Sequence, residues 1–226
     1  MKTRTLLLLT LILCQLSHAQ SGMVRGNVNV KHEKKKSAGS ADAVVWLIPY
    51  ESRSPLAPGP VAHLVQKNKQ FSPHVVPITT GTTVEFPNRD PFFHDVFSIY
   101  HGKPFDLGLY ESGSSRKVAF TKPGVSYIFC NIHPEMSAVI VALQTPYFAQ
   151  TNGEGKFEIA NIPAGRYKLR VWHELASASE LEGLERDIQI NTGENVLSPL
   201  VLHASDTTPT HTNKYGEAYS RDRNPY

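Results

Sequence analysis

The chain has 226 residues, 40% of them hydrophobic, with 23 lysine and arginine residues against 20 aspartate and glutamate residues. This length is enough for one large or two small domains, each with a hydrophobic core. The nearly balanced charge argues against nucleic-acid binding, and the basic run KHEKKK at 31–36 lacks interleaved aromatic or arginine residues, which is typical of a solvated loop.

Residues 1–19 have the features of a secretory signal peptide. Lys2 and Arg4 precede an apolar run at 6–14, and Ser17 and Ala19 stand at the small-residue positions of a cleavage site. The apolar run is too short to span a bilayer, and no later stretch is long and apolar enough to do so. We therefore expect a periplasmic or secreted protein without stable membrane insertion.

Cleavage after Ala19 changes both the charge and the cysteine count. Two of the 23 basic residues leave with the signal, so 21 remain against 20 acidic residues. Cys130 becomes the only cysteine of the mature chain. In an oxidising compartment an unpaired thiol tends to be oxidised or cross-linked, so something is expected to hold it.

Short strands separated by turn residues dominate the rest of the chain, whereas helix signals are scarce. Runs rich in Val, Ile, Phe and Tyr recur between Gly, Pro and Asn clusters, a spacing typical of all-β sandwiches or barrels. The predicted strands are 24–30, 43–48, 82–86, 96–100, 117–120, 125–130, 138–143, 156–159, 167–172 and 187–190. The tail at 204–226 has almost no aliphatic residues and is predicted to be disordered.

The stretch FCNIHPEM at 129–136 combines three soft metal ligands around one short loop. Alternation along the preceding strand places Cys130 at its end, and Met136 begins the next strand, so the loop can bring Cys130, His133 and Met136 together. His94, from an upstream loop, supplies a fourth donor. Two histidines and one cysteine in a trigonal arrangement, with a weak axial methionine, make a blue-copper electron-transfer site.

Other metal centres fit this pattern less well. Structural zinc sites favour all-Cys/His ligand sets, and a thioether is a poor zinc donor. A binuclear copper centre would need a second cysteine in the loop, and a multicopper oxidase or copper reductase would need paired H-x-H histidines; the chain has neither. This limits the chemistry to one metal and one electron, so no enzymatic activity is expected. Six further histidines show no metal-ligand spacing and are expected at surface or packed positions: His63, His74, His101, His173, His203 and His211.

A longer pattern surrounds these ligands: FSP at 71–73, GTTVEFPN at 81–88, His94, and KPGVSYIFCNIHPEM at 122–136. In these residues the chain resembles a cupredoxin of the plastocyanin, pseudoazurin and amicyanin group, and the short gap between His133 and Met136 is similar to the ligand loop of amicyanin. The resemblance implies a Greek-key cupredoxin sandwich at 61–145 that binds one type 1 copper ion.

One residue departs from the cupredoxin pattern. Cupredoxins usually carry asparagine directly after the upstream histidine, whereas Asp95 stands there in this chain. A carboxylate accepts hydrogen bonds but does not donate them, and its negative charge is expected to favour Cu(II) and lower the reduction potential. Backbone N–H groups of the loop, which begins at Asn131, are expected to point at the thiolate, while Pro134 removes a competing donor and stiffens the turn.

The exposed loop around His133 is the expected docking surface. The edge of the His133 ring would be the electron port, inside an apolar collar of Pro91, Phe92, Phe93 and Pro134 that suits brief docking. The resemblance to amicyanin implies a quinoprotein amine dehydrogenase or a c-type cytochrome as the redox partner.

A second pattern lies further along the chain, in NGEGKFEIANIPAGRYKLRVWHE at 152–174. It resembles the carboxypeptidase regulatory-like, or transthyretin-like, β-sandwich. The strands at 24–30 and 43–48 are typical openings of such a domain, so residues 20–50 and 146–203 are expected to form one small β-sandwich into which the cupredoxin is inserted. The proline-rich stretch at 52–60 and TPY at 145–147 would be the linkers.

These patterns favour a blue copper protein that carries single electrons between redox partners. One alternative is a copper carrier or sensor whose outer sandwich binds a client, although carriers favour methionine-rich tracts and the mature chain has only Met23 and Met136. Another alternative is an adhesion or assembly module with a vestigial copper domain, which the complete ligand set disfavours.

Overall fold

The computed structural model describes residues 21–32, 41–51, 56–99, 102–205 and 211–219. The predicted signal peptide and most of the basic run at 31–36 lie outside these residues. The described chain is nearly all β-structure, as expected, with one short helix. Its elements are β1 (Ser21–His32), β2 (Val44–Pro49), β3 (Ala62–His63), β4 (Val65–Lys67), β5 (Gln70–Ser72), β6 (Val75–Thr79), β7 (Thr83–Pro87), β8 (His94–Ser98), β9 (Phe105–Tyr110), β10 (Ser115–Ala119), β11 (Gly124–Cys130), β12 (Ser137–Leu143), β13 (Phe148–Gln150), β14 (Lys156–Pro163), β15 (Gly165–Trp172), α1 (Ala178–Gly183), β16 (Arg186–Ile190), β17 (Gly193–Val196) and β18 (Leu200–Ala204).

The middle of the chain forms a two-sheet sandwich, here called the inner sandwich (residues 62–143). One sheet has the strand order β10-β7-β3, and the other has the order β6-β12-β11-β8-β9. Alternate residues of β7 face the space between the sheets, where Val84 and Phe86 are fully buried. The parallel pairing of β6 with β12 joins segments far apart in the sequence, because Val139 lies opposite Val75.

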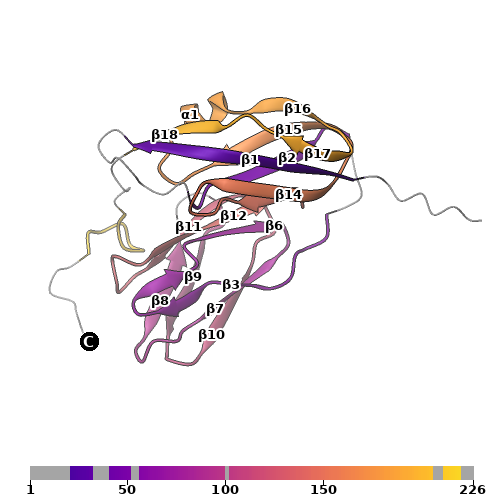
Figure 1. Cartoon of the computed structure of the whole chain (residues 1–226). Helices are drawn as coiled ribbons and strands as arrows, with labels where there is room; N and C mark the ends of the chain where they lie inside the picture. Colours follow the sequence, from indigo (N-terminus) through magenta and orange to yellow (C-terminus); the bar gives the residue numbers. More distant parts are fainter. Residues whose placement is uncertain (1–20, 33–40, 52–55, 100–101, 206–210, 220–226) are drawn as a thin grey trace, which may run out of the picture.

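The strands on either side of the inner sandwich in the sequence form a second sandwich, here called the outer sandwich (β1, β2 and β13–β18). In one sheet β1 pairs with β14 on one side and with β17 and β18 on the other; the second sheet has the order β13-β2-β15-β16. The strands before the inner sandwich therefore pair with those after it, and Figure 1 shows the two sandwiches stacked. The division into two separately folding domains remains a prediction. One domain would comprise residues 20–50 and 146–203, and the other residues 61–145.

A shared apolar contact joins the sandwiches. We call it the interface cluster; its buried members are Val44, Val75, Val139, Val141, Leu143 and Trp172. The predicted linker TPY at 145–147 is not a free connection, because the buried Thr145 hydroxyl donates to the Leu47 carbonyl oxygen at 2.7 Å. In the interface cluster, Val139, Val141 and Leu143 of β12 pack with Val44 and Trp172 of the outer sandwich.

An ion pair spans the same contact and makes its stability depend on pH. His74 Nε2 lies 2.6 Å from a carboxylate oxygen of Glu174, and this hydrogen bond raises the pKa of His74 above 6.5. The folded state therefore binds the proton more tightly than the unfolded chain does, so the stabilisation is fully present below about pH 6.5 and is lost as pH rises through the raised pKa.

We predict that His74→Gln lowers the free energy of unfolding at about pH 5.5 and has a smaller effect at about pH 9, where the imidazole of the wild type is neutral. Denaturant unfolding at several pH values measures this difference. Glu174→Gln removes the other member of the ion pair. It should therefore also lower the free energy of unfolding more at about pH 5.5 than at about pH 9. An equal effect of His74→Gln at all pH values would show that the ion pair contributes nothing.

The prediction of a disordered tail is wrong for two parts of 204–226. Ala204 ends β18, and residues 211–219 lie against the inner sandwich beside the end of β11. The lack of aliphatic residues misled the prediction, because this segment is held by aromatic and charged side chains instead. No helix among the described residues is long and apolar enough to cross a membrane.

Candidate metal centre

Two neighbouring strands bring the predicted ligands together. β8 begins at His94, β11 ends at Cys130, and the antiparallel register places Cys130 opposite Val96. The loop that follows folds back tightly, because the Met136 N–H donates to the His133 carbonyl oxygen at 3.1 Å and the Cys130 N–H donates to the Met136 carbonyl oxygen at 3.3 Å. The loop thus returns His133 to the end of β11, where Cys130 lies.

The three side chains form a compact, buried group. The Sγ atom of Cys130 lies 3.6 Å from the Nδ1 atom of His94 and 3.6 Å from the Nδ1 atom of His133. All three donor atoms lie within 4.8 Å of one another, and no other such group of His, Cys, Asp and Glu occurs among the described residues. With metal–ligand bonds of about 2.0–2.3 Å and angles of about 120°, trigonal donors are about 3.5–4.0 Å apart, so the spacing suits one shared metal ion.

Burial controls the protonation of this group. It raises the pKa of the Cys130 thiol, although backbone hydrogen bonds from Asp95, Ile132 and His133 act in the opposite direction. Burial also lowers the pKa of both His94 and His133. Without metal, the group is therefore a neutral thiol between two neutral imidazoles, and a metal ion that binds here displaces the thiol proton.

Asp90 fixes the orientation of His94, a contact that the sequence patterns did not reveal. A carboxylate oxygen of Asp90 lies 2.9 Å from His94 Nε2 and holds a proton there, which leaves Nδ1 free to face Cys130. Asp90 also accepts hydrogen bonds from the backbone N–H groups of Asn68 and Lys69. Burial alone would raise the pKa of Asp90, but these donors and His94 lower it overall.

Replacing Asp90 with alanine should weaken metal binding about 10- to 100-fold, the usual cost of losing a partner that orients a ligand. His94 would lose its hydrogen-bond acceptor at Nε2 and could rotate. Competition titration of the metal-free protein against a chelator for Cu(II) measures the change. Asp90→Asn keeps an oxygen acceptor without the charge and should lie between the wild type and Asp90→Ala; an unchanged affinity in both variants would contradict the positioning role.

The remaining predicted residues lie near this group in different ways. Met136 is fully buried in the same core cluster as Cys130, beside the predicted ligands. The Asp95 carboxylate accepts a hydrogen bond from the Asn131 side chain at 3.2 Å, and the Asp95 carbonyl oxygen accepts one from the Asn131 N–H at 2.8 Å. Asp95 and Asn131 therefore connect the His94 strand to the ligand loop, while Pro134 is exposed at the tip of the loop.

The predicted docking collar is only partly as expected. Pro91 and Pro134 are exposed, and the side chain of Phe93 is 37% exposed. The Phe92 ring packs against both imidazoles, with centroid distances of 5.4 Å to His94 and 5.4 Å to His133. The prediction of an exposed His133 ring is wrong, since that residue is only 4% exposed, and Phe92 is part of the reason.

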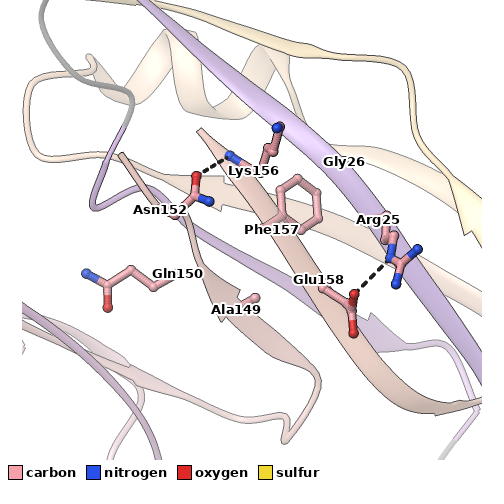
Figure 2. A pocket seen from close by; sticks show the side chains of 8 residues that line it. All are labelled: Arg25, Gly26, Ala149, Gln150, Asn152, Lys156, Phe157 and Glu158. Carbon is pink, nitrogen blue, oxygen red and sulfur yellow. Dashed lines mark hydrogen bonds and ion pairs between the residues drawn. The ribbon is translucent and has the colours of Figure 1, made fainter. Parts of the chain in front are cut away.

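One hollow in the described surface lies away from this centre. It is a hollow of about 380 Å³ on the outer sandwich (Figure 2), lined by Arg25, Gly26, Ala149, Gln150, Asn152, Lys156, Phe157 and Glu158. Arg25 is already paired with Glu158 at 2.8 Å and with Glu194 at 2.9 Å. The positive charge of Arg25 in the lining of the hollow is thus compensated by carboxylates of the same chain. None of the candidate metal ligands lines this hollow.

No protein-family model and no curated protein match this sequence. Solved structures that are similar to part of the chain include a copper-containing enzyme and cupredoxins. The "Cu-containing nitrite reductase (NirK) from Thermus scotoductus SA-01" is 33% identical over 40% of this chain and 24% of that chain, with a TM-score of 0.36. The "Novel Purple Cupredoxin from Nitrosopumilus maritimus" is 24% identical over 36% of this chain and 99% of that chain, with a TM-score of 0.33.

The amicyanin from Paracoccus versutus is 20% identical over 37% of this chain and 81% of that chain, with a TM-score of 0.34. The chain thus spans about a quarter of the nitrite reductase but most of the purple cupredoxin and of the amicyanin. Each of these similarities covers less than half of this chain. The assignment of the centre rests on its own side chains: one buried thiol and two imidazoles, a donor set that suits copper.

Proposed function

We propose that the chain is a mononuclear type 1 copper protein that carries single electrons between redox partners and is not itself an enzyme. The observation that carries the proposal is the buried Cys130 thiol, which has the Nδ1 atoms of His94 and His133 both 3.6 Å away. Copper bound there would supply a one-electron couple between Cu(II) and Cu(I). Cys130, His94 and His133 would hold it, with the Met136 sulfur as a weak axial ligand.

The surroundings of the donors suit electron transfer. His94 and Cys130 are fixed by the register of two packed strands, and Asp90 prevents rotation of the His94 ring. Because these donors are buried and already converge, little has to move when the charge of the centre changes. Phe92 covers both imidazoles and keeps water from them.

The apolar surface beside the centre suits a brief encounter with a partner. Pro91, Phe93 and Pro134 are exposed around the buried His133, so an approaching protein would meet apolar atoms close to the copper. We propose a c-type cytochrome or a quinoprotein amine dehydrogenase as the partner, in the periplasm or outside the cell. This location follows from the signal peptide predicted at 1–19.

The alternative of a copper carrier or sensor fits the burial less well. A carrier must pass its metal directly to a client, whereas Cys130 and His94 are fully buried and His133 nearly so. The outer sandwich would serve as the client-binding surface, but its hollow is shallow and its charges are paired within the chain. We therefore favour the electron carrier.

Adding Cu(II) to the metal-free protein tests the proposal directly. We expect one equivalent to bind and to produce an intense visible absorption, because electron density moves from the thiolate to the metal. Ascorbate should bleach the colour, and oxidation should restore it, over repeated cycles. Stoichiometric copper binding without an intense band would refute a type 1 centre, and rapid handover of copper to a weak chelator would favour the carrier.

A further inference from the structure

Residues 211–219 form a compact segment that lies on the ligand loop; we call this segment the strap. It folds on itself, since the Asn213 side-chain oxygen accepts hydrogen bonds from the N–H groups of Tyr215 and Glu217, each at 2.9 Å. The Asn213 N–H in turn donates to the Glu217 carbonyl oxygen at 2.9 Å. In Figure 1 it is the yellow trace beside the inner sandwich, on the side where the C-terminus is marked.

Aromatic side chains attach both ends of the strap to the ligand loop. The His211 ring stacks on Phe129 with a centroid distance of 3.9 Å, and its Nε2 atom lies 2.9 Å from the Pro134 carbonyl oxygen. The Tyr219 hydroxyl donates to the carbonyl oxygen of Cys130 at 3.0 Å. The strap thus contacts Cys130 itself and the residues on either side of the Cys130–His133 pair.

Lys214 connects the strap to both sides of the centre. Its backbone N–H donates to the Asn131 side-chain oxygen at 3.1 Å. Its ammonium group lies 2.9 Å from Asp95 Oδ2 and 2.9 Å from Asp106 Oδ2, and the side chains of Lys214 and Asp95 are only 13% and 8% exposed. Burial acts to lower the pKa of Lys214, but the two carboxylates outweigh it and raise the pKa to about 12, so Lys214 is charged.

This contact compensates for the unusual residue after His94. A nearly buried carboxylate beside a metal ligand is costly without a partner. Lys214 supplies a cation to Asp95, while Asn131 bridges Asp95 and the Lys214 backbone. The His94 strand, the ligand loop and the strap therefore share one hydrogen-bonded network.

We propose that the strap holds the Cys130–His133 loop in its metal-binding shape, with Lys214 as the positioning residue that ties this loop to Asp95. The experiment that measures copper release rests on the proposed copper function. The inference itself concerns the shape of the loop before any metal binds. Loss of the strap would leave the donors in place and make the loop looser, so that bound copper escapes faster.

A double-mutant cycle at Asp95 and Lys214 tests this role. Lys214→Ala should speed the loss of Cu(II) to an excess of chelator about 10-fold or more, and Lys214→Arg should restore most of the retention. In the Asp95→Asn background, Lys214→Ala should have a clearly smaller effect, because no buried charge is left without a partner. Lys156→Ala, which removes an exposed ion pair with Glu154 on the outer sandwich, is the control and should change nothing.

A metal-free measurement separates this inference from the copper proposal. Removing residues 206–226, which leaves β18 intact, should speed hydrogen exchange at the Asn131 and Met136 amides while exchange in β15 stays unchanged. If the truncated chain folds only with the Asp95→Asn substitution, the comparison is made in that background. Hydrogen exchange at the Asn131 and Met136 amides should then be faster in truncated Asp95→Asn than in full-length Asp95→Asn. Unchanged exchange in the loop, or equal effects of Lys214→Ala in both backgrounds, would overturn the proposal even if the wild type turns blue with copper.

Discussion

Cys130→Ser should abolish the intense visible absorption that Cu(II) produces with the wild-type protein. A serine hydroxyl ionises far less readily than a thiol and is a hard ligand, so the soft sulfur donor between His94 and His133 is lost. The side chain of Cys130 is fully buried and packed, and serine has nearly the same size, so the fold should survive. Absorption spectra after one equivalent of Cu(II) measure the result.

A second variant provides the control for the colour. Met136→Leu keeps a large apolar side chain in the core cluster and leaves Cys130, His94 and His133 untouched. Because the axial role proposed for Met136 is that of a weak ligand, we expect this variant to keep both copper and colour and to have a higher reduction potential. An intense band in Cys130→Ser, or loss of copper in Met136→Leu, would contradict the assigned roles.

Trp172→Ala should lower the free energy of unfolding by about 3–5 kcal/mol, the usual cost of removing a buried tryptophan. Trp172 is only 7% exposed and belongs to the interface cluster, with Val139, Val141 and Leu143 of β12 among its members. Its removal would leave a cavity between the two sandwiches. Denaturant unfolding, followed both by β-structure and by the copper colour, measures the loss.

The two probes also report how the sandwiches are coupled. In the wild type we expect a single transition, and in Trp172→Ala we expect the outer sandwich to unfold before the colour is lost. Val196→Ala is the matched control, because Val196 is 75% exposed and its truncation should cost almost nothing. A loss below about 1 kcal/mol for Trp172→Ala would mean that the cluster does not hold the sandwiches together.

The long strands and the ligand triad could be predicted from the sequence because their signals are local. Strands such as 125–130 and 138–143 carry enough Val, Ile and Phe to stand out, and the spacing of Cys130 and His133 shows directly that they share a loop. The position of His94 next to that loop could be predicted from the resemblance to cupredoxins. Short strands such as β13 and β17 were missed, because three or four residues give no periodicity.

Other features depend on contacts between distant residues and leave no local pattern. Asp90 lies four residues before His94, and this spacing alone does not predict a contact. The contact forms because the loop between them brings the Asp90 carboxylate to the Nε2 atom of His94. Burial of His133 depends on how Phe92 folds over it. The strap was missed because disorder was predicted from the scarcity of aliphatic residues in this segment. His211, Lys214 and Tyr219 instead bind through stacking and hydrogen bonds to groups about 80 or more residues earlier in the sequence.

The division of the outer sandwich between segments on either side of the inner sandwich sets the order in which the protein can assemble. Arg25 of β1 and Glu158 of β14 are 133 positions apart, so in a chain that emerges N-terminus first β1 is exposed long before its partner. The inner sandwich is complete by then, and its folding would bring β2 and β13 close together, since Trp46 lies opposite Phe148. This shortens the loop that remains to be closed. Until then, the edges of β1 are open to neighbouring chains, which makes the N-terminal strand the segment most in need of a chaperone.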